Sequence, residues 1–169
     1  MSTRSVTFQG TPLTLVGNAI EVGTPAPAFS VLDNELKSVA QDILPGNVTV
    51  ILTVPSLDTP VCDTEVRRFN REAAQLSDDV QILCISADLP FAQARWCGAA
   101  GIDRVQTLSD HLQMSFGTAY GVQIKELRLL TRAVFVVDRE SRVEYIQIVP
   151  EITDEPDYGA VLSAIKTIV

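Results

Sequence analysis

The chain of 169 residues is 46% hydrophobic and 20% charged, a composition typical of a folded globular protein that can bury a core. Its formal net charge of −8, without a cluster of Lys and Arg, argues against nucleic acid and favours a small neutral substrate. No apolar stretch is long enough to span a bilayer, and the first residues offer no secretory signal. We therefore expect a cytoplasmic protein with no membrane partner.

The first half of the chain contains strand patterns followed by a helix pattern. Residues 6–16 alternate polar and apolar side chains around a Gly-Thr-Pro turn, which predicts a β-hairpin, and residues 29–32 predict a short strand. Residues 47–54 are almost all apolar or β-branched, as in a strand buried on both faces, and Pro55 ends this strand. From Pro60 onward the apolar residues follow helical spacing, at Val66, Phe69, Ala73 and Leu76.

The second half of the chain again contains strand patterns and helix patterns in turn. Residues 79–86 predict a second buried strand, and residues 90–100 predict a helix that ends at Gly101. Residues 133–137 and 142–148 lie on either side of a short polar turn, which predicts two antiparallel strands.

The last predicted element is a helix over residues 158–169. The order favours a single domain over residues 1–169, because no repeat or linker interrupts it. We expect an α/β protein with a thioredoxin-like fold, in which helices flank a mixed central sheet and a β-hairpin precedes it.

The cysteines at positions 62, 84 and 97 are too few and too widely spaced for a disulfide scaffold. None belongs to a Cys-x-x-Cys pair, and His111 is the single histidine of the chain, which offers little for a zinc site. Each cysteine is therefore either a buried packing residue or a reactive thiol.

Cys62 has the sequence context of a reactive thiol. Thr59 is a favourable N-cap and Pro60 a favourable first helical residue, so Cys62 falls in the first turn of the predicted helix. Unpaired N–H groups and the helix dipole favour a thiolate there, and the thiolate is the nucleophile. The alternative is a half-buried cysteine in an amphipathic helix.

Asp63 and Glu65 oppose this activation, because nearby negative charge disfavours a thiolate. We therefore expect a positive group from elsewhere in the fold to face the sulfur. Ionisation alone gives little catalysis, since a thiolate becomes less nucleophilic as its pKa falls. Donors must also stabilise the charge that develops on the oxygens of a substrate.

Pro55, Thr59 and Cys62 form the pattern Pro-x-x-x-Thr-x-x-Cys, which resembles the active-site motif of the peroxiredoxins. Other segments resemble the bacterial thiol peroxidase subfamily in its atypical two-cysteine form. Together with the hairpin they extend over nearly the whole chain: residues 86–93, Arg95, and residues 97–99, 119–122, 132–136 and 149–153.

This resemblance implies a thiol-dependent peroxidase that reduces hydrogen peroxide and organic hydroperoxides. Cys62 is implied to attack the peroxide, and Cys97 to resolve the resulting sulfenic acid into an intrachain disulfide. Thr59 is implied to hydrogen-bond the sulfur and the peroxide, Pro55 to shield the thiolate, and Arg132 to supply the positive charge. The implied reductant is thioredoxin, the implied assembly is a homodimer, and no metal or organic cofactor is implied.

The residues alone leave other interpretations open. Cys97 on its own pattern is a packing residue, and Arg132 is an exposed charge at the start of a strand. Cys84 lies inside a strand and is expected to be an inert core residue. Tyr120 and Phe91 are expected in the core rather than at a substrate.

A disulfide between Cys62 and Cys97 requires Cα atoms within about 7 Å of each other. We expect the two cysteines to begin separate helices, so one or both helices must unwind for the bond to form.

Two other functions compete with a peroxidase. A general dithiol–disulfide oxidoreductase normally uses a Cys-x-x-Cys pair, which this sequence lacks. A non-catalytic thioredoxin-fold module that binds partners or copper needs a close cysteine pair with a histidine ligand, which is also missing.

Overall fold

The computed structural model describes residues 3–73 and 75–169. The side chain of Ala73, which we expected on the apolar face of the first helix, lies outside the described residues. Within the described chain, no helix is long and apolar enough to cross a membrane.

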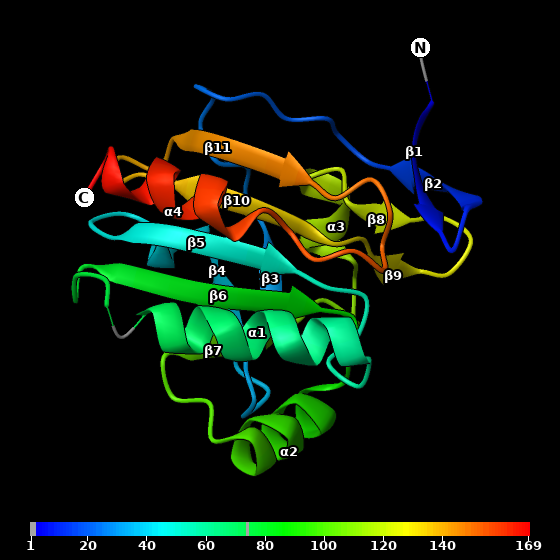
Figure 1. The fold of residues 1–169 in the computed structure, drawn as a ribbon, viewed down its shortest axis with the longest axis horizontal. Helices are drawn as coiled ribbons and strands as arrows, with labels where there is room; N and C mark the ends of the chain where they lie inside the picture. The colour runs from blue at the N-terminus through cyan, green and yellow to red at the C-terminus, as the bar shows by residue number, and fades with distance from the viewer. Residues whose placement is uncertain (1–2, 74) are drawn as a thin grey trace.

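A seven-stranded mixed sheet forms the centre of the fold, in the order β11-β10-β5-β6-β7-β3-β4 (Figure 1). β5, β6 and β7 are parallel, whereas β10 pairs antiparallel with β5, and β3 pairs antiparallel with β7. The strands of this sheet are β3 (Ser30–Leu32), β4 (Ser38–Ala40), β5 (Val48–Thr53), β6 (Val80–Ser86), β7 (Val105–Ser109), β10 (Ala133–Val137) and β11 (Val143–Ile148).

A smaller four-stranded sheet lies beside the central sheet, in the order β1-β2-β8-β9 (Figure 1). Its strands are β1 (Arg4–Phe8), β2 (Thr11–Val16), β8 (Gln123–Ile124) and β9 (Leu129–Leu130). The helices are η1 (Gln41–Ile43), α1 (Pro60–Ala73), α2 (Pro90–Ala100), α3 (Ser115–Ala119) and α4 (Tyr158–Lys166).

The strands and helices that the sequence predicts are all present, with ends that differ by a few residues. The N-terminal hairpin turns at Gln9 and Gly10, both with positive φ, so Pro12 lies inside β2 rather than in the turn. The predictions omitted β4, η1, β7, α3, β8 and β9, which are short or, in β7, interrupted by polar residues.

Two buried clusters lie on opposite faces of the central sheet, because successive strand side chains point to opposite faces. In β5, Val50 and Leu52 pack with residues of α1 and α4, while Ile51 packs with Phe116 of α3 and Phe29. α1 and α4 lie together over one face in Figure 1, and α2 lies below α1 in this view. A third, small cluster joins the hairpin to Ile124 and Ile152.

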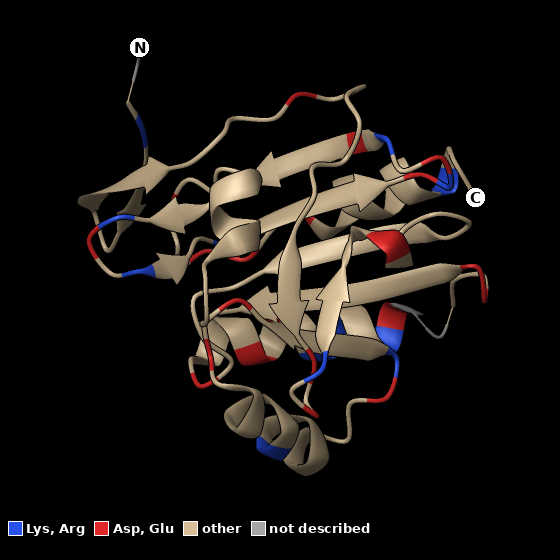
Figure 2. Ribbon diagram, turned by 180° about the vertical axis from the view of Figure 1, so that it is seen from behind, with Lys and Arg blue, Asp and Glu red and all other residues tan. Residues whose placement is uncertain are grey.

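Charged residues lie mainly in the loops and helices around the central strands (Figure 2). Lys and Arg are scattered over separate segments on this side of the molecule rather than gathered into one stripe.

Candidate active site

Cys62 lies in the first turn of α1, as the sequence predicts. α1 begins at Pro60, and the carbonyl of Thr59 accepts the N–H of Asp63 at 3.0 Å, so Thr59 precedes the helix as expected. The Cys62 side chain has an exposure of 0% and packs in the same cluster as Leu57. The positive end of a helix dipole at such a place favours an anion.

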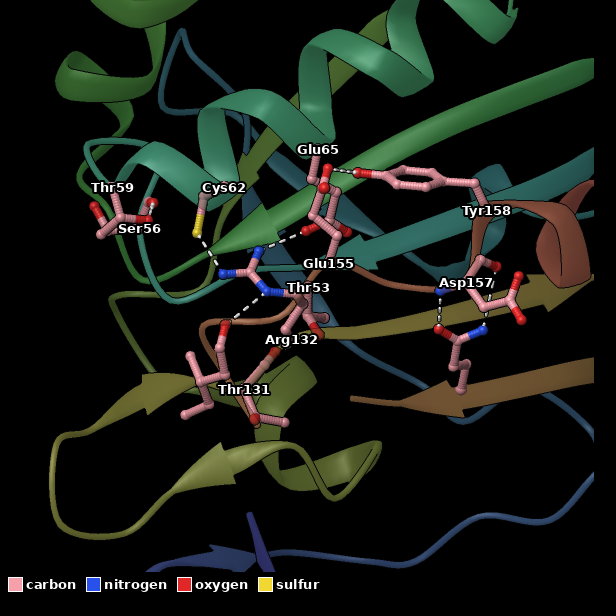
Figure 3. A network of polar contacts seen from close by, with 12 residues as sticks. Thr53, Ser56, Thr59, Cys62, Glu65, Thr131, Arg132, Glu155, Asp157 and Tyr158 are labelled. Atoms are coloured by element: carbon pink, nitrogen blue, oxygen red, sulfur yellow. Dashed lines mark hydrogen bonds and ion pairs between the residues drawn. The ribbon is translucent and has the colours of Figure 1, made fainter. Parts of the chain in front are cut away.

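Arg132 directly precedes β10 and is 1% exposed. Its guanidinium donates from Nη2 to Cys62 Sγ at 3.4 Å and from Nη1 to Glu65 Oε2 at 2.6 Å (Figure 3). A third bond runs from Nε to the carbonyl of Ile152 at 2.9 Å. The expected positive group therefore faces the sulfur. The alternative of an exposed strand-end charge is wrong, because the side chain extends into the protein and is bonded at all three nitrogens.

Arg132 stays protonated, and so positively charged, despite its burial. Burial alone lowers the pKa of an arginine, but the neighbouring Cys62 and Glu65 more than compensate and raise the pKa of Arg132. A guanidinium that is planar and always charged suits this place, since it donates to Cys62, Glu65 and the carbonyl of Ile152 at once.

Glu65 competes with Cys62 for the same cation. Its side chain is 0% exposed, and burial raises its pKa to about 7, although Arg132 opposes this shift through its charge and hydrogen bond. Glu65 Oε1 has no hydrogen-bond partner among the described residues. A proton on Glu65 relieves the excess of negative charge around Arg132, so Glu65 opposes a thiolate at Cys62 less than its sequence position suggests.

Ser56 anchors Thr59. The Thr59 hydroxyl donates to the carbonyl of Ser56 at 2.9 Å, and the Ser56 hydroxyl donates to Asp88 Oδ1 at 2.7 Å. Asp88 Oδ2 also accepts the N–H of Leu57 at 2.9 Å, which fixes the loop before α1. No hydrogen bond joins Thr59 to the Cys62 sulfur within the described residues, so the expected contact of Thr59 with sulfur and peroxide stays a prediction.

A pocket of about 240 Å³ opens beside Arg132. Pro55 and Thr59 both contribute to its wall, next to the residue that contacts the Cys62 sulfur. Apolar side chains and hairpin residues make up most of the rest. The complete lining is Phe8, Gln9, Pro55, Thr59, Pro60, Val61, Arg132, Ile152 and Thr153.

The tip of the N-terminal hairpin forms one side of this pocket and is held there by Glu151. The Glu151 carboxylate accepts the N–H groups of Gln9 at 3.1 Å and Gly10 at 2.9 Å. Backbone N–H groups of Thr153 and Gly10 lower the pKa of Glu151 to about 2, so it is ionised at neutral pH. Phe8 precedes Gln9 and Gly10, lines the pocket and is 45% exposed.

A family model described as Redoxin matches residues 21–162 of the chain. The chain is 56% identical to the thiol peroxidase of Bacillus subtilis over 164 residues, which cover 97% of this chain and 98% of that relative. It is 52% identical to the thiol peroxidase of Staphylococcus aureus over 163 residues, which cover 96% of this chain and 98% of that relative. The chain belongs to the thiol peroxidases of the peroxiredoxin superfamily. It is an oxidoreductase that reduces peroxides with a thiol.

Solved structures agree with this assignment. A peroxiredoxin-like protein from Aquifex aeolicus superposes with a TM-score of 0.92 at 40% identity, over 100% of both chains. A thiol peroxidase from Chromobacterium violaceum superposes with a TM-score of 0.86 at 20% identity, over 96% of this chain and 95% of that chain, which supports the fold. The predicted thioredoxin-like α/β fold is thus confirmed.

Cys97 of this thiol peroxidase lies in the last turn of α2, so the expectation that it begins a helix is wrong. α2 begins earlier, at Pro90, and continues until Gly101 takes a left-handed conformation. The Cys97 sulfur lies 3.4 Å from the hydroxyl of Thr107, which donates its own proton to Asn34 Oδ1 at 3.0 Å. The Thr107 hydroxyl thus links the Cys97 sulfur to the side chain of Asn34.

The other residues with open interpretations are also placed by the structure. Cys84 is 1% exposed in β6, and burial raises the pKa of its thiol well above the usual value, in agreement with an inert core residue. Tyr120 is buried as expected, at 1% exposure. Phe91 is 68% exposed, so its expected core position is wrong: it lies on the outer side of a helix with few buried residues.

Sequence reasoning did not single out Asp88 or Glu151. Asp88 follows β6, and the loop before α1 follows β5, its parallel neighbour. The carboxyl ends of parallel strands meet at one edge of a sheet, which was the available signal for Asp88. Glu151 had no comparable signal, because it joins segments that lie far apart in the chain.

Within residues 3–73 and 75–169, no group of three or more His, Cys, Asp and Glu side chains could hold a metal ion.

Proposed function

We propose that Cys62 is the peroxide-attacking cysteine of this enzyme and that Cys97 resolves the oxidised product. The observation that carries the assignment is the buried contact of 3.4 Å between Arg132 Nη2 and Cys62 Sγ, beside a pocket that opens to solvent. Among the three cysteines, Cys62 alone combines a helix first turn with an arginine at its sulfur.

In the first step the Cys62 thiolate attacks the terminal oxygen of a hydroperoxide. The O–O bond breaks, the sulfur becomes a sulfenic acid, and the leaving alkoxide takes up a proton to give an alcohol, or water from hydrogen peroxide. Arg132 stabilises the negative charge as it moves from sulfur to oxygen. The Thr59 hydroxyl acts on the peroxide after turning from Ser56, and Pro55 limits the access of water to the sulfur.

The apolar lining of the pocket supports organic hydroperoxides as substrates in addition to hydrogen peroxide. Since Cys62 is fully buried, the substrate reaches it through this pocket with small displacements of the lining side chains.

In the second step Cys97 loses its proton and attacks the sulfenic sulfur, which forms an intrachain disulfide and releases water. Both sulfurs have other partners in the reduced protein, at Arg132 and Thr107, and no disulfide joins them. Local unwinding around one or both cysteines therefore precedes the bond. Thioredoxin is the proposed reductant, which returns both thiols.

We further propose a homodimer that needs no metal or organic cofactor and works in the cytoplasm, where thiols stay reduced. Large exposed apolar side chains support the dimer: Leu89 is 52%, Phe91 68% and Leu112 61% exposed. Phe91→Asp should shift the sedimentation of a dimer toward that of a monomer. Dialysis against a chelator should leave peroxidase activity unchanged.

The direct experiment mixes the reduced enzyme with one equivalent of cumene hydroperoxide, counts the free thiols and maps disulfides by mass spectrometry. The proposal requires the loss of two thiols and a link between Cys62 and Cys97, both absent in Cys62→Ser. Cys84→Ser is the matched control and should react as the wild type does. Slow unselective oxidation, or a link through Cys84, would contradict the assignment.

A further inference from the structure

The helix that carries Cys97 is held in place by few buried side chains. Along α2, only Pro90 and Gln93 are buried, and both lie in its first half. The second half contains Gly98 and ends at Gly101. Segments with few buried apolar contacts open more easily than the rest of a protein. The position of Cys97 therefore depends on contacts at the end of α2.

Besides the contact of Cys97 with Thr107 of β7, several of these contacts come from one face of α1, beginning with Trp96. Asp63 Oδ1 accepts the indole N–H of Trp96 at 2.8 Å, and Asp63 Oδ2 accepts Arg67 Nε at 2.8 Å. The Arg67 guanidinium lies 5.9 Å from the centre of the Trp96 ring and donates to the carbonyl of Ala100 at 3.3 Å. A single arginine thus binds the tryptophan and the last residue of α2 together.

Asn70 continues the same face. Positions 63, 67 and 70 are separated by four and three residues, which places them in a row along α1. Asn70 Oδ1 accepts the backbone N–H groups of Asp103 at 3.2 Å and Arg104 at 2.7 Å. This row, which we call the α1 latch (Asp63, Arg67, Asn70), therefore binds the chain from position 96 to position 104.

The latch begins next to both cysteines. Asp63 directly follows Cys62, and Trp96 directly precedes Cys97. A disulfide brings two Cα atoms to about 5.5–6 Å and the sulfurs to about 2.05 Å. When the unwinding occurs at α2, the end of that helix must leave the contacts that the latch provides before Cys97 reaches Cys62.

We propose that Asp63, Arg67 and Asn70 are positioning residues of the resolving step, and that the strength of their contacts sets how fast Cys97 reaches oxidised Cys62. This inference rests on the proposed roles of the two cysteines. The sulfenic acid of Cys62 has two fates. Cys97 converts it to a disulfide with release of water, or a second hydroperoxide oxidises it to a sulfinic acid and is reduced to an alcohol. A tighter latch slows the first reaction and leaves more time for the second.

The test is the ratio of disulfide to sulfinic acid, measured by mass spectrometry across a series of cumene hydroperoxide concentrations. Both products derive from the same sulfenic acid, so their ratio does not depend on how fast that acid forms. In Arg67→Gln, the peroxide concentration that gives equal amounts should rise about fivefold, as expected for the loss of partly exposed contacts worth about 1 kcal/mol. Arg71→Gln, at an exposed position of the same helix, is the matched control and should behave as the wild type.

Asn70→Ala provides a second variant, at the end of the latch that is farthest from Cys62. It should shift the ratio in the same direction, and Trp96, the single tryptophan of the chain, should report faster opening in stopped-flow fluorescence. Ratios equal to that of the control in both variants would overturn the proposal, as would more sulfinic acid at equal peroxide. If the wild type forms no disulfide between Cys62 and Cys97, the proposed function has failed; an unchanged ratio with that disulfide present refutes the latch alone.

Discussion

Replacing Glu65 with glutamine should change how the stability of the reduced enzyme depends on pH. The substitution keeps the shape of the side chain and an oxygen that can accept from Arg132 Nη1, but it removes the titrating group. In the wild type, burial raises the pKa of Glu65 from 4.5 to about 7, so the folded state binds a proton that the unfolded state has released between these values. The stabilisation from this proton is complete below about pH 4.5 and is lost as the pH rises through 7.

The size of the effect follows from the same two values. A pKa that differs by one between the folded and unfolded states corresponds to about 1.36 kcal/mol, so the proton on Glu65 contributes roughly 3 kcal/mol at low pH. Between pH 5 and pH 8, the free energy of unfolding of the wild type should therefore fall by roughly 2.5 kcal/mol relative to that of Glu65→Gln.

Urea unfolding of both proteins at pH 5, 6, 7 and 8, in the presence of a reductant, measures this difference directly. Glu72→Gln, on the same helix, is the matched control and should follow the pH dependence of the wild type. A difference between wild type and Glu65→Gln that stays constant from pH 5 to pH 8 would refute the argument, because it would mean that Glu65 is ionised throughout that range.

Other substitutions test the remaining contacts of the site and fold. Arg132→Met should lower kcat/KM for hydroperoxides about 100- to 1000-fold, since it removes the donor at the Cys62 sulfur. Stopped-flow kinetics measure this change, and a loss below tenfold would exclude a role of Arg132 in the transition state. Phe8→Ala should lower kcat/KM for cumene hydroperoxide about fivefold and kcat/KM for hydrogen peroxide less than twofold, because only the larger substrate contacts the apolar wall of the pocket. Equal losses for both substrates would contradict this role of the hairpin. Asp157→Ala should lower the free energy of unfolding by about 1 kcal/mol, since Asp157 Oδ1 accepts the N–H of Ala160 at the start of α4; Asp154→Ala, outside the helix, is the control, and equal effects would argue against the cap.

The elements that could be predicted from sequence are those whose pattern is local. β5 and β6 consist mostly of apolar or β-branched residues, and Pro60 marks the start of α1, so their positions followed from neighbouring residues alone. β8 and β9 have two residues each, too few for any periodicity to be detected. They are strands because they pair with the hairpin and with each other, which is a property of the tertiary structure.

In the candidate site, too, some features follow from a local sequence pattern and others depend on the tertiary structure. The first-turn position of Cys62 follows from the cap and the proline before it, whereas the partner of its sulfur lies 70 residues away in the chain. The sequence predicted that some positive group was needed, and the family motif pointed to Arg132. Neither the helix pattern nor the family motif could indicate that Glu65 would also bind the Arg132 guanidinium, because the sequence does not reveal which carboxylates of a helix are buried.

The tip of the N-terminal hairpin is a part of the pocket wall whose side chains can be substituted without changing the central sheet. The buried residues of the hairpin, including Val6 and Leu13, pack in a small cluster with Ile124 and Ile152, apart from the two clusters of the central sheet, and the hairpin is fixed to the pocket through backbone groups that bond Glu151. Side chains at its tip, such as Phe8, can therefore be exchanged while the central sheet and the Cys62–Arg132 contact remain as they are. Random libraries restricted to these few tip positions offer a practical way to alter the range of hydroperoxides that the enzyme accepts.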